Sequence, residues 1–105
     1  MVVSILTRKT QITDRSRFES QLAAVRQKIE EVLRAQSGFV SVQYLWGLDE
    51  GGRIAQVTSW HSPEDCQKYV REGGAATVAT IEDGAVPTAA HPDGAWVRQT
   101  YETAS

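Results

Sequence analysis

One stretch of the chain repeats its apolar residues with the period of an α-helix. Between positions 16 and 36 they recur at steps of three and four, which places them on one helical stripe. The stripe consists of Phe18, Leu22, Val25, Ile29, Val32 and Leu33. Ser16 and Glu19 have the spacing of a capping box, and Gly38 stands where a left-handed residue often ends a helix. The pattern predicts a helix over 16–36.

Four other segments have the composition of β-strands, with many β-branched and aromatic residues and no proline. They cover residues 2–12, 39–48, 54–61 and 96–102. The second and third are joined by the sequence DEGGR, whose glycines suit a tight connection. We therefore expect these two strands to pair antiparallel as a hairpin.

A second helical region follows the third strand. Ser62 is the predicted N-cap, and Pro63 and two acidic residues then occupy the first turn, where they suit the helix dipole. The short apolar stripe of this helix is Cys66, Tyr69 and Val70. The glycine pair at 73–74 interrupts the pattern, and the helix should resume to about Asp83. Residues 84–94 have the glycine, proline and aspartate content of a loop.

The order of elements, β-α-β-β-α-β, predicts one α+β domain over residues 1–105. Its class is ferredoxin-like, with a four-stranded antiparallel sheet and both helices on one face. Alternation along the third strand places one set of residues on one face: Ile54, Gln56, Thr58 and Trp60. The opposite face carries Ala55, Val57, Ser59 and His61.

The second strand shows the same mixture of apolar residues on both faces. One face is predicted to carry Val40, Val42, Tyr44, Trp46 and Leu48, and the other Phe39, Ser41, Gln43 and Leu45. Two helices can cover only one side of a sheet, so the apolar residues on the other side need a second partner. The simplest partner is an identical subunit, which predicts a homodimer closed through the sheet face.

Composition narrows the function without identifying it. A length of 105 residues corresponds to one domain. The net charge of -2, with eleven scattered Lys and Arg, argues against nucleic acid as the main partner. A single cysteine, Cys66, excludes an internal disulfide and cannot by itself form a zinc site. Neither a signal peptide nor an apolar run of about 20 residues is present, so we expect no membrane association and a cytoplasmic location.

Residues 37–70 resemble the antibiotic biosynthesis monooxygenase (ABM) superfamily of dimeric α/β-barrel proteins. The sequence of this stretch is SGFVSVQYLWGLDEGGRIAQVTSWHSPEDCQKYV. The family pattern is a Gly-Phe before the second strand, a hairpin, a Trp that ends the third strand, and Ser-x-Glu opening a helix. The matching residues are Gly38, Phe39, Trp60, Ser62 and Glu64. The resemblance implies a pocket between sheet and helices in each subunit.

The family includes several activities, and two positions bear on them. Some members oxidise phenols with O₂ and without metal or flavin, some act on small quinols, and some degrade haem. Phenol-oxidising members have an Asn four residues before the Trp; Gln56 stands there and keeps an amide that can bind a substrate oxygen. Haem-degrading members have an iron-ligating His about ten residues after the Trp. Val70 stands there and cannot ligate, which disfavours haem degradation.

These considerations give a set of candidate site residues. Trp60, as a wall, and Gln56, as a hydrogen-bonding group, are the catalytic candidates, and Tyr44, Trp46, Tyr69 and Phe18 are the substrate-binding candidates. For every aromatic residue in the set, the alternative is plain core packing. No metal site and no cofactor are predicted, because no metal-ligand spacing or nucleotide-binding motif occurs.

Several other reactive side chains are expected to have ordinary structural roles. His61 has the opposite strand parity to Trp60, so it should point away from the pocket, at a rim or an interface. Cys66 is expected to be a small buried hydrophobe. His91 is expected to lie in a solvated loop, and Arg8 and Arg98 on solvated strand positions.

Two functions remain open. The first is a cofactor-independent monooxygenase acting on an electron-rich phenol or quinol, with Gln56 holding a substrate oxygen and Trp60 forming a wall. The second is a non-catalytic dimeric protein that binds a small aromatic molecule in the same pocket. No general base is evident on the predicted pocket face, so the sequence does not decide between them.

Overall fold

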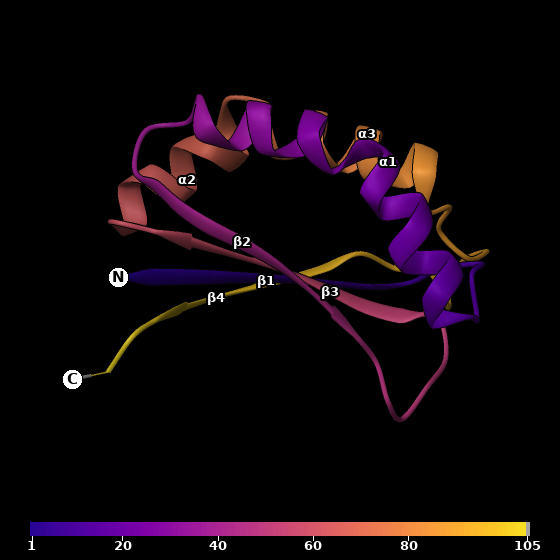
Figure 1. The fold of residues 1–105 in the computed structure, drawn as a ribbon. Helices are drawn as coiled ribbons and strands as arrows, with labels where there is room; N and C mark the ends of the chain where they lie inside the picture. Colours follow the sequence, from indigo (N-terminus) through magenta and orange to yellow (C-terminus); the bar gives the residue numbers. More distant parts are fainter. Residues whose placement is uncertain (105) are drawn as a thin grey trace.

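The computed structural model describes residues 1–104, in which one sheet is covered on one face by a layer of helices (Figure 1). The elements are β1 (Val2–Lys9), α1 (Arg15–Arg34), β2 (Phe39–Trp46), β3 (Arg53–Trp60), α2 (Pro63–Arg71), α3 (Gly74–Ala85) and β4 (Val97–Glu102). The strands lie in the order β2-β3-β1-β4, and every neighbouring pair is antiparallel. This arrangement confirms the predicted ferredoxin-like α+β class.

The long helix α1 forms because its apolar stripe faces the sheet. Four residues of the predicted stripe are buried: Phe18, Leu22, Ile29 and Leu33. The predicted capping box is wrong. Asp14 is the N-cap, since its side chain accepts a hydrogen bond from the Ser16 backbone N–H at 3.2 Å, and Glu19 instead pairs with Arg15 at 2.9 Å. The helix therefore starts one residue before the predicted Ser16.

The second helical region is two helices, because the chain turns at the glycine pair. Ser62 caps α2 as predicted, with its hydroxyl accepting from the Asp65 backbone N–H at 3.2 Å. Gly73 then adopts a φ of +92°, a left-handed conformation that ends the first helix at no steric cost to glycine. Helix α3 runs on to Ala85, so the first two residues of the predicted loop 84–94 are helical.

A β-bulge near the start of β2 changes the predicted faces of that strand. Phe39 lies opposite Trp60, while Ser41 lies opposite Ser59, so Val40 is an extra residue in the ladder. The extra residue reverses the parity, and Phe39 therefore points toward the helices, contrary to the prediction. Its ring packs edge-on against Trp60 with centroids 5.6 Å apart, and Val40 is 39% exposed. From Val42 to Trp46 the strand alternates as predicted, but Leu48, predicted on the same face, lies beyond the end of β2 and is 88% exposed.

The opposite face of the sheet is not covered by any element of residues 1–104 (Figure 1). Alternate residues of β1 and β3 are buried under the helices, and the residues between them are only partly covered. Apolar side chains on this open face are Val3, Ile5, Leu45, Val57, Val97 and Tyr101. Three of these, Leu45, Val97 and Tyr101, are about half exposed. The helices thus cover one face only, as the order of the elements predicted.

Gly38 and Gly84 should respond oppositely to replacement by alanine. Gly38 has a φ of +75°, and an added Cβ would lie 2.0 Å from the Asp65 carboxylate. Gly38→Ala should lower the free energy of unfolding by about 1–3 kcal/mol, the usual cost of a strained backbone. Gly84 lies within α3 with no atom near an added Cβ, so Gly84→Ala should raise the stability by up to about 1 kcal/mol.

Urea unfolding of both variants beside the wild type checks this pair. A Gly38→Ala variant as stable as Gly84→Ala would show that the link between α1 and β2 does not need the left-handed residue.

Candidate functional site

A cleft of about 360 Å³ opens between α1 and β2, and we call it the α1–β2 cleft. Its apolar walls are Phe18, Leu22, Tyr44 and Trp46, with Arg15, Glu19 and Arg26 at its polar positions. The rings of Phe18 and Trp46 lie 5.2 Å apart between centroids. The volume falls in the lower part of the range of small-molecule pockets, roughly 300–1,000 Å³. Three of the four predicted substrate-binding residues therefore line one cleft.

Gln56 lies behind this cleft and connects its wall to the interior. Its side-chain amide donates to the Tyr44 hydroxyl at 3.2 Å and to Glu82 Oε1 at 2.9 Å. The amide oxygen is buried and has no hydrogen-bond partner among residues 1–104. Gln56 itself is 2% exposed, so it does not form part of the cleft surface. Its contact with Tyr44 makes that hydroxyl the link between cleft and core.

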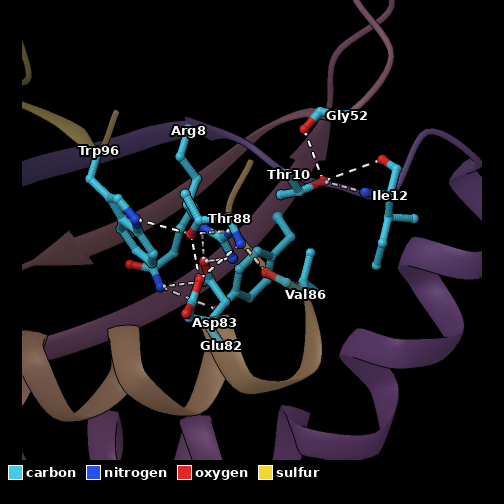
Figure 2. Close-up of polar contacts among 11 residues, drawn as sticks. Arg8, Thr10, Ile12, Gly52, Glu82, Asp83, Val86, Thr88 and Trp96 are labelled. Carbon is cyan, nitrogen blue, oxygen red and sulfur yellow. Dashed lines mark hydrogen bonds and ion pairs between the residues drawn. The ribbon is translucent and has the colours of Figure 1, made fainter. Parts of the chain in front are cut away.

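The interior end of this network is a buried ion pair between Arg8 and Glu82 (Figure 2). Arg8 Nε and Nη2 both donate to Glu82 Oε2, at 3.0 and 2.7 Å, and Nη1 donates to the Val86 carbonyl at 2.8 Å. Each side chain is 1% exposed. The expectation that Arg8 is solvated is wrong, because its strand position faces the helices and Glu82 of α3 lies opposite.

Thr88 and Trp96 close the interior beside Arg8, as Figure 2 shows. The Trp96 ring lies 4.4 Å from the Arg8 guanidinium, and its N–H donates to the Thr88 hydroxyl at 3.1 Å. That hydroxyl also accepts from Arg8 Nη1 at 3.2 Å and donates to the Asp83 carboxylate. The segment after α3 is thereby tied to β1, and it also forms an isolated bridge between Thr10 and Thr88. Thr88, which lies in the predicted loop 84–94, therefore helps to enclose the interior.

Trp60 and Tyr69 lie together in the apolar part of the core, away from the lining of the cleft. Trp60 is fully buried, and its N–H donates to the Thr58 hydroxyl at 2.9 Å. Its ring lies 4.6 Å from that of Tyr69, between centroids. Burial raises the pKa of Tyr69 to about 12, and its hydroxyl has no partner among the described residues. The structure does not place these two predicted site residues with Tyr44, Trp46 and Phe18.

The Tyr44 hydroxyl is held in its neutral form. Burial, and next the negative charge of Glu82, raise the pKa of Tyr44 well above its ordinary value. A neutral phenol keeps both a donor and an acceptor at physiological pH. The Tyr44 hydroxyl can therefore donate one hydrogen bond while its oxygen accepts the bond from Gln56.

The remaining candidates have the structural roles expected of them, with one exception. His61 follows the end of β3 and is exposed, and His91 is exposed in the segment after α3. Cys66 is 3% exposed, and burial raises the pKa of its thiol, which opposes a nucleophilic role. Arg98 is partly buried rather than solvated, since it faces the helices and donates to the Ser4 hydroxyl at 2.7 Å.

Glu82 is the polar residue of the site that the sequence analysis missed. It lies four residues after Val78, so the two share one face of α3, and both are buried. The spacing of four residues from the apolar Val78 is the signal in the sequence that places Glu82 on the inner face of α3. A buried carboxylate at such a position needs a buried cation as its partner. Arg8 lies two residues after buried Leu6 on β1, so the two side chains share the inner face of that strand.

Within residues 1–104, no group of three or more His, Cys, Asp or Glu side chains is arranged to hold a metal ion. None of the helices in this same part of the chain is long and apolar enough to cross a membrane.

The fold and cleft define a ferredoxin-like α+β protein with a ligand-sized hollow between its helices and its sheet. No protein-family model matches the chain, and neither does any curated protein. Solved structures do match. One is SnoaB, a cofactor-independent oxygenase from Streptomyces nogalater, with a TM-score of 0.65 and 15% identity, over 99% of this chain and 93% of that one.

Two further structures resemble the chain to a similar degree. A protein of Bordetella bronchiseptica assigned to the antibiotic biosynthesis monooxygenases matches with a TM-score of 0.69 and 10% identity, over 99% of this chain and 97% of that one. The haem degrader MhuD from Mycobacterium tuberculosis matches with a TM-score of 0.64 and 21% identity, over 98% and 95%. The fold is therefore that of the ABM superfamily, as the sequence resemblance implied, and identities this low show the fold alone.

Removing one charge of the buried ion pair should destabilise the protein strongly. Glu82→Gln leaves the Arg8 guanidinium buried without a counter-charge, which should lower the free energy of unfolding by about 3–5 kcal/mol. Replacing both partners by methionine should cost less than this single change, because no charge is then buried. Urea unfolding monitored by circular dichroism measures each effect.

Lys9→Met is the matched control. It breaks the neighbouring ion pair with Glu50, whose 2.8 Å contact is exposed to solvent, and should leave the unfolding midpoint near that of the wild type. A Glu82→Gln variant with the same midpoint as Lys9→Met would refute the importance of the buried pair.

Proposed function

We propose that this chain is a cofactor-independent monooxygenase that acts on a small aromatic phenol or quinol bound in the α1–β2 cleft. The observation that carries the proposal is the cleft itself, whose aromatic lining includes Tyr44, a residue linked through the buried Gln56 amide to the buried carboxylate of Glu82. The cleft volume of about 360 Å³ suits a molecule of one or two rings. The fold shared with SnoaB, a cofactor-independent oxygenase, is consistent with this activity.

The chemistry asked of the protein is to bind the substrate and move one proton. The substrate hydroxyl donates to the Tyr44 oxygen while Tyr44 passes its own proton toward Glu82, whose Oε1 accepts from the same Gln56 amide that donates to the Tyr44 hydroxyl. Gln56 fixes the Tyr44 hydroxyl for this transfer. The electron-rich anion then reduces O₂ directly. One oxygen atom takes the place of the hydrogen on a ring carbon and becomes a carbonyl, and the other leaves as water with that hydrogen and the hydrogen of the substrate hydroxyl.

In this proposal the residues of the apolar core support the site without touching the substrate. Tyr69 of α2 packs against Trp60, which is the last residue of β3. The same strand carries Gln56. Val70, at the position of the haem ligand in haem-degrading members, is 43% exposed on α2 and cannot bind iron. Haem degradation is therefore not proposed. The predicted cytoplasmic location stays a prediction.

A non-catalytic small-molecule-binding protein is the second candidate, and one observation favours it. Glu82 already accepts hydrogen bonds from Arg8 and Gln56, so its oxygens are engaged in the structure. Fewer positions on this carboxylate are then free to accept a proton from a substrate. The same cleft would then bind an aromatic molecule without turning it over.

Oxygen consumption should separate the two candidates. With a panel of hydroquinones, naphthols and anthrones, the wild type should consume O₂ above the buffer rate, and Tyr44→Phe should lose roughly 100-fold or more of that rate. Tyr101→Phe, which removes an exposed hydroxyl on β4, should keep the wild-type rate. An oxygen electrode gives the rates.

The outcomes divide as follows. If no compound is turned over, but one quenches tryptophan fluorescence saturably and Trp46→Phe abolishes the quenching, the protein is a binding module. If no compound is turned over and none quenches, the proposed site is wrong.

We also propose a homodimer through the open sheet face, because half-exposed apolar residues on a broad sheet need a cover. Val57→Lys places a charge on the central strand of this face and should shift the protein toward a monomer in light scattering. Ala24→Lys, on the exposed side of α1, should leave the mass unchanged. A wild type that is monomeric at micromolar concentration would contradict this part of the proposal.

A further inference from the structure

We infer that the ligand of the α1–β2 cleft is an aromatic carboxylate, recognised through the guanidinium of Arg26. The inference rests on the proposed function only in taking this cleft as the ligand site. It adds the requirement that the ligand carries a negative charge. The residues of the proposed reaction, Tyr44, Gln56 and Glu82, do not impose this requirement.

Arg26 is held at the cleft in a fixed position with part of its donor capacity unused. Its guanidinium lies 5.2 Å from the centroid of the Tyr44 ring, and Nη2 donates to the Val42 carbonyl at 3.2 Å. Its Nε is buried and has no hydrogen-bond partner among residues 1–104. Nε does lie 3.5 Å from Glu30 Oε1, which is an ion pair without hydrogen-bond geometry. Arg26 therefore makes no hydrogen bond to an anionic group among residues 1–104, and Glu30 lies only at ion-pair distance from it.

The charged residues that line the cleft carry a net positive charge, which is located at Arg26. Arg15 and Glu19 form an ion pair with each other at 2.9 Å, so their charges compensate. The remaining charged lining residue is Arg26. Glu30 offsets it only in part, because Glu30 does not line the cleft and also lies 3.9 Å from Arg34. A single negative group on the ligand would complete the charge balance.

The distribution of apolar and charged groups indicates how such a ligand lies. The rings of Phe18 and Trp46 supply surfaces for an aromatic ring. Tyr44 and Arg26 stack on one another at one side, so a carboxylate at Arg26 and a hydroxyl at Tyr44 can belong to one molecule. A carboxylate fits better than a phosphate, because one partly exposed arginine compensates one charge and a phosphate carries nearly two.

Calorimetric titration of 2-naphthoate against its neutral isostere 2-naphthamide tests the inference. Wild-type protein should bind the carboxylate at least about tenfold more tightly than the amide, as expected for one charge-assisted hydrogen bond. Arg26→Gln should remove most of this preference while leaving the affinity for the amide unchanged. Arg17→Gln is the matched control, because Arg17 lies on the same helix outside the cleft and donates a hydrogen bond to Gln21 at 2.8 Å, with no other side-chain hydrogen bond among residues 1–104. It should keep the wild-type preference.

Each failure has a different meaning. If the wild type binds both compounds with equal affinity, or if Arg26→Gln weakens both equally, the charge requirement is wrong and the aromatic cleft stands. If neither compound binds and the phenol panel also gives no quenching, the proposed site is wrong, and the inference with it. Thermal unfolding of both variants should match the wild type, so a loss of preference can be assigned to binding.

Discussion

The buried ion pair between Arg8 and Glu82 is the contact on which the polar half of this interior depends. Two charges removed from water require nearly complete compensation, because the penalty for burying either alone is several kcal/mol. Four hydrogen bonds donated by Arg8 and one donated to Glu82 by Gln56, together with the Trp96 ring beside the guanidinium, provide it. The pair joins the middle of the sheet to α3. It thereby sets the distance between the sheet and the helix layer at that end of the domain.

The interior consequently has two chemically different ends. Beneath α2 it is apolar, with Trp60 packed between Phe39 and Tyr69. Beneath α3 it is a network of hydrogen bonds that reaches from Arg8 through Glu82 and Gln56 to the Tyr44 hydroxyl. This second end reaches the α1–β2 cleft through Tyr44. The chemistry that we propose for this domain is therefore located at Tyr44, although the family resemblance pointed first to Trp60.

Much of the fold followed from local patterns. The stripe of α1, the Ser62 cap, the break at the glycine pair and the alternation of β3 each depend on neighbours within a few residues, and all were predicted. The resemblance to the ABM superfamily agreed with them. Aromatic residues at inward-facing positions were sensible site candidates for the same reason, and three of them, Phe18, Tyr44 and Trp46, line one cleft. The sequence could not separate these from Trp60 and Tyr69, because all five occupy inward-facing positions.

The sequence alone thus determined the order, type and inward faces of most elements, since helix and strand periods are properties of consecutive residues. Only the tertiary structure decided which polar groups share the interior. Arg8 and Glu82 are 74 residues apart, and neither position shows by itself whether its charge will find a partner or water. The bulge at Val40 was hidden likewise, because strand parity is set by the ladder that β2 forms with β3. Packing between distant segments selects these features, and a local pattern carries no information about it.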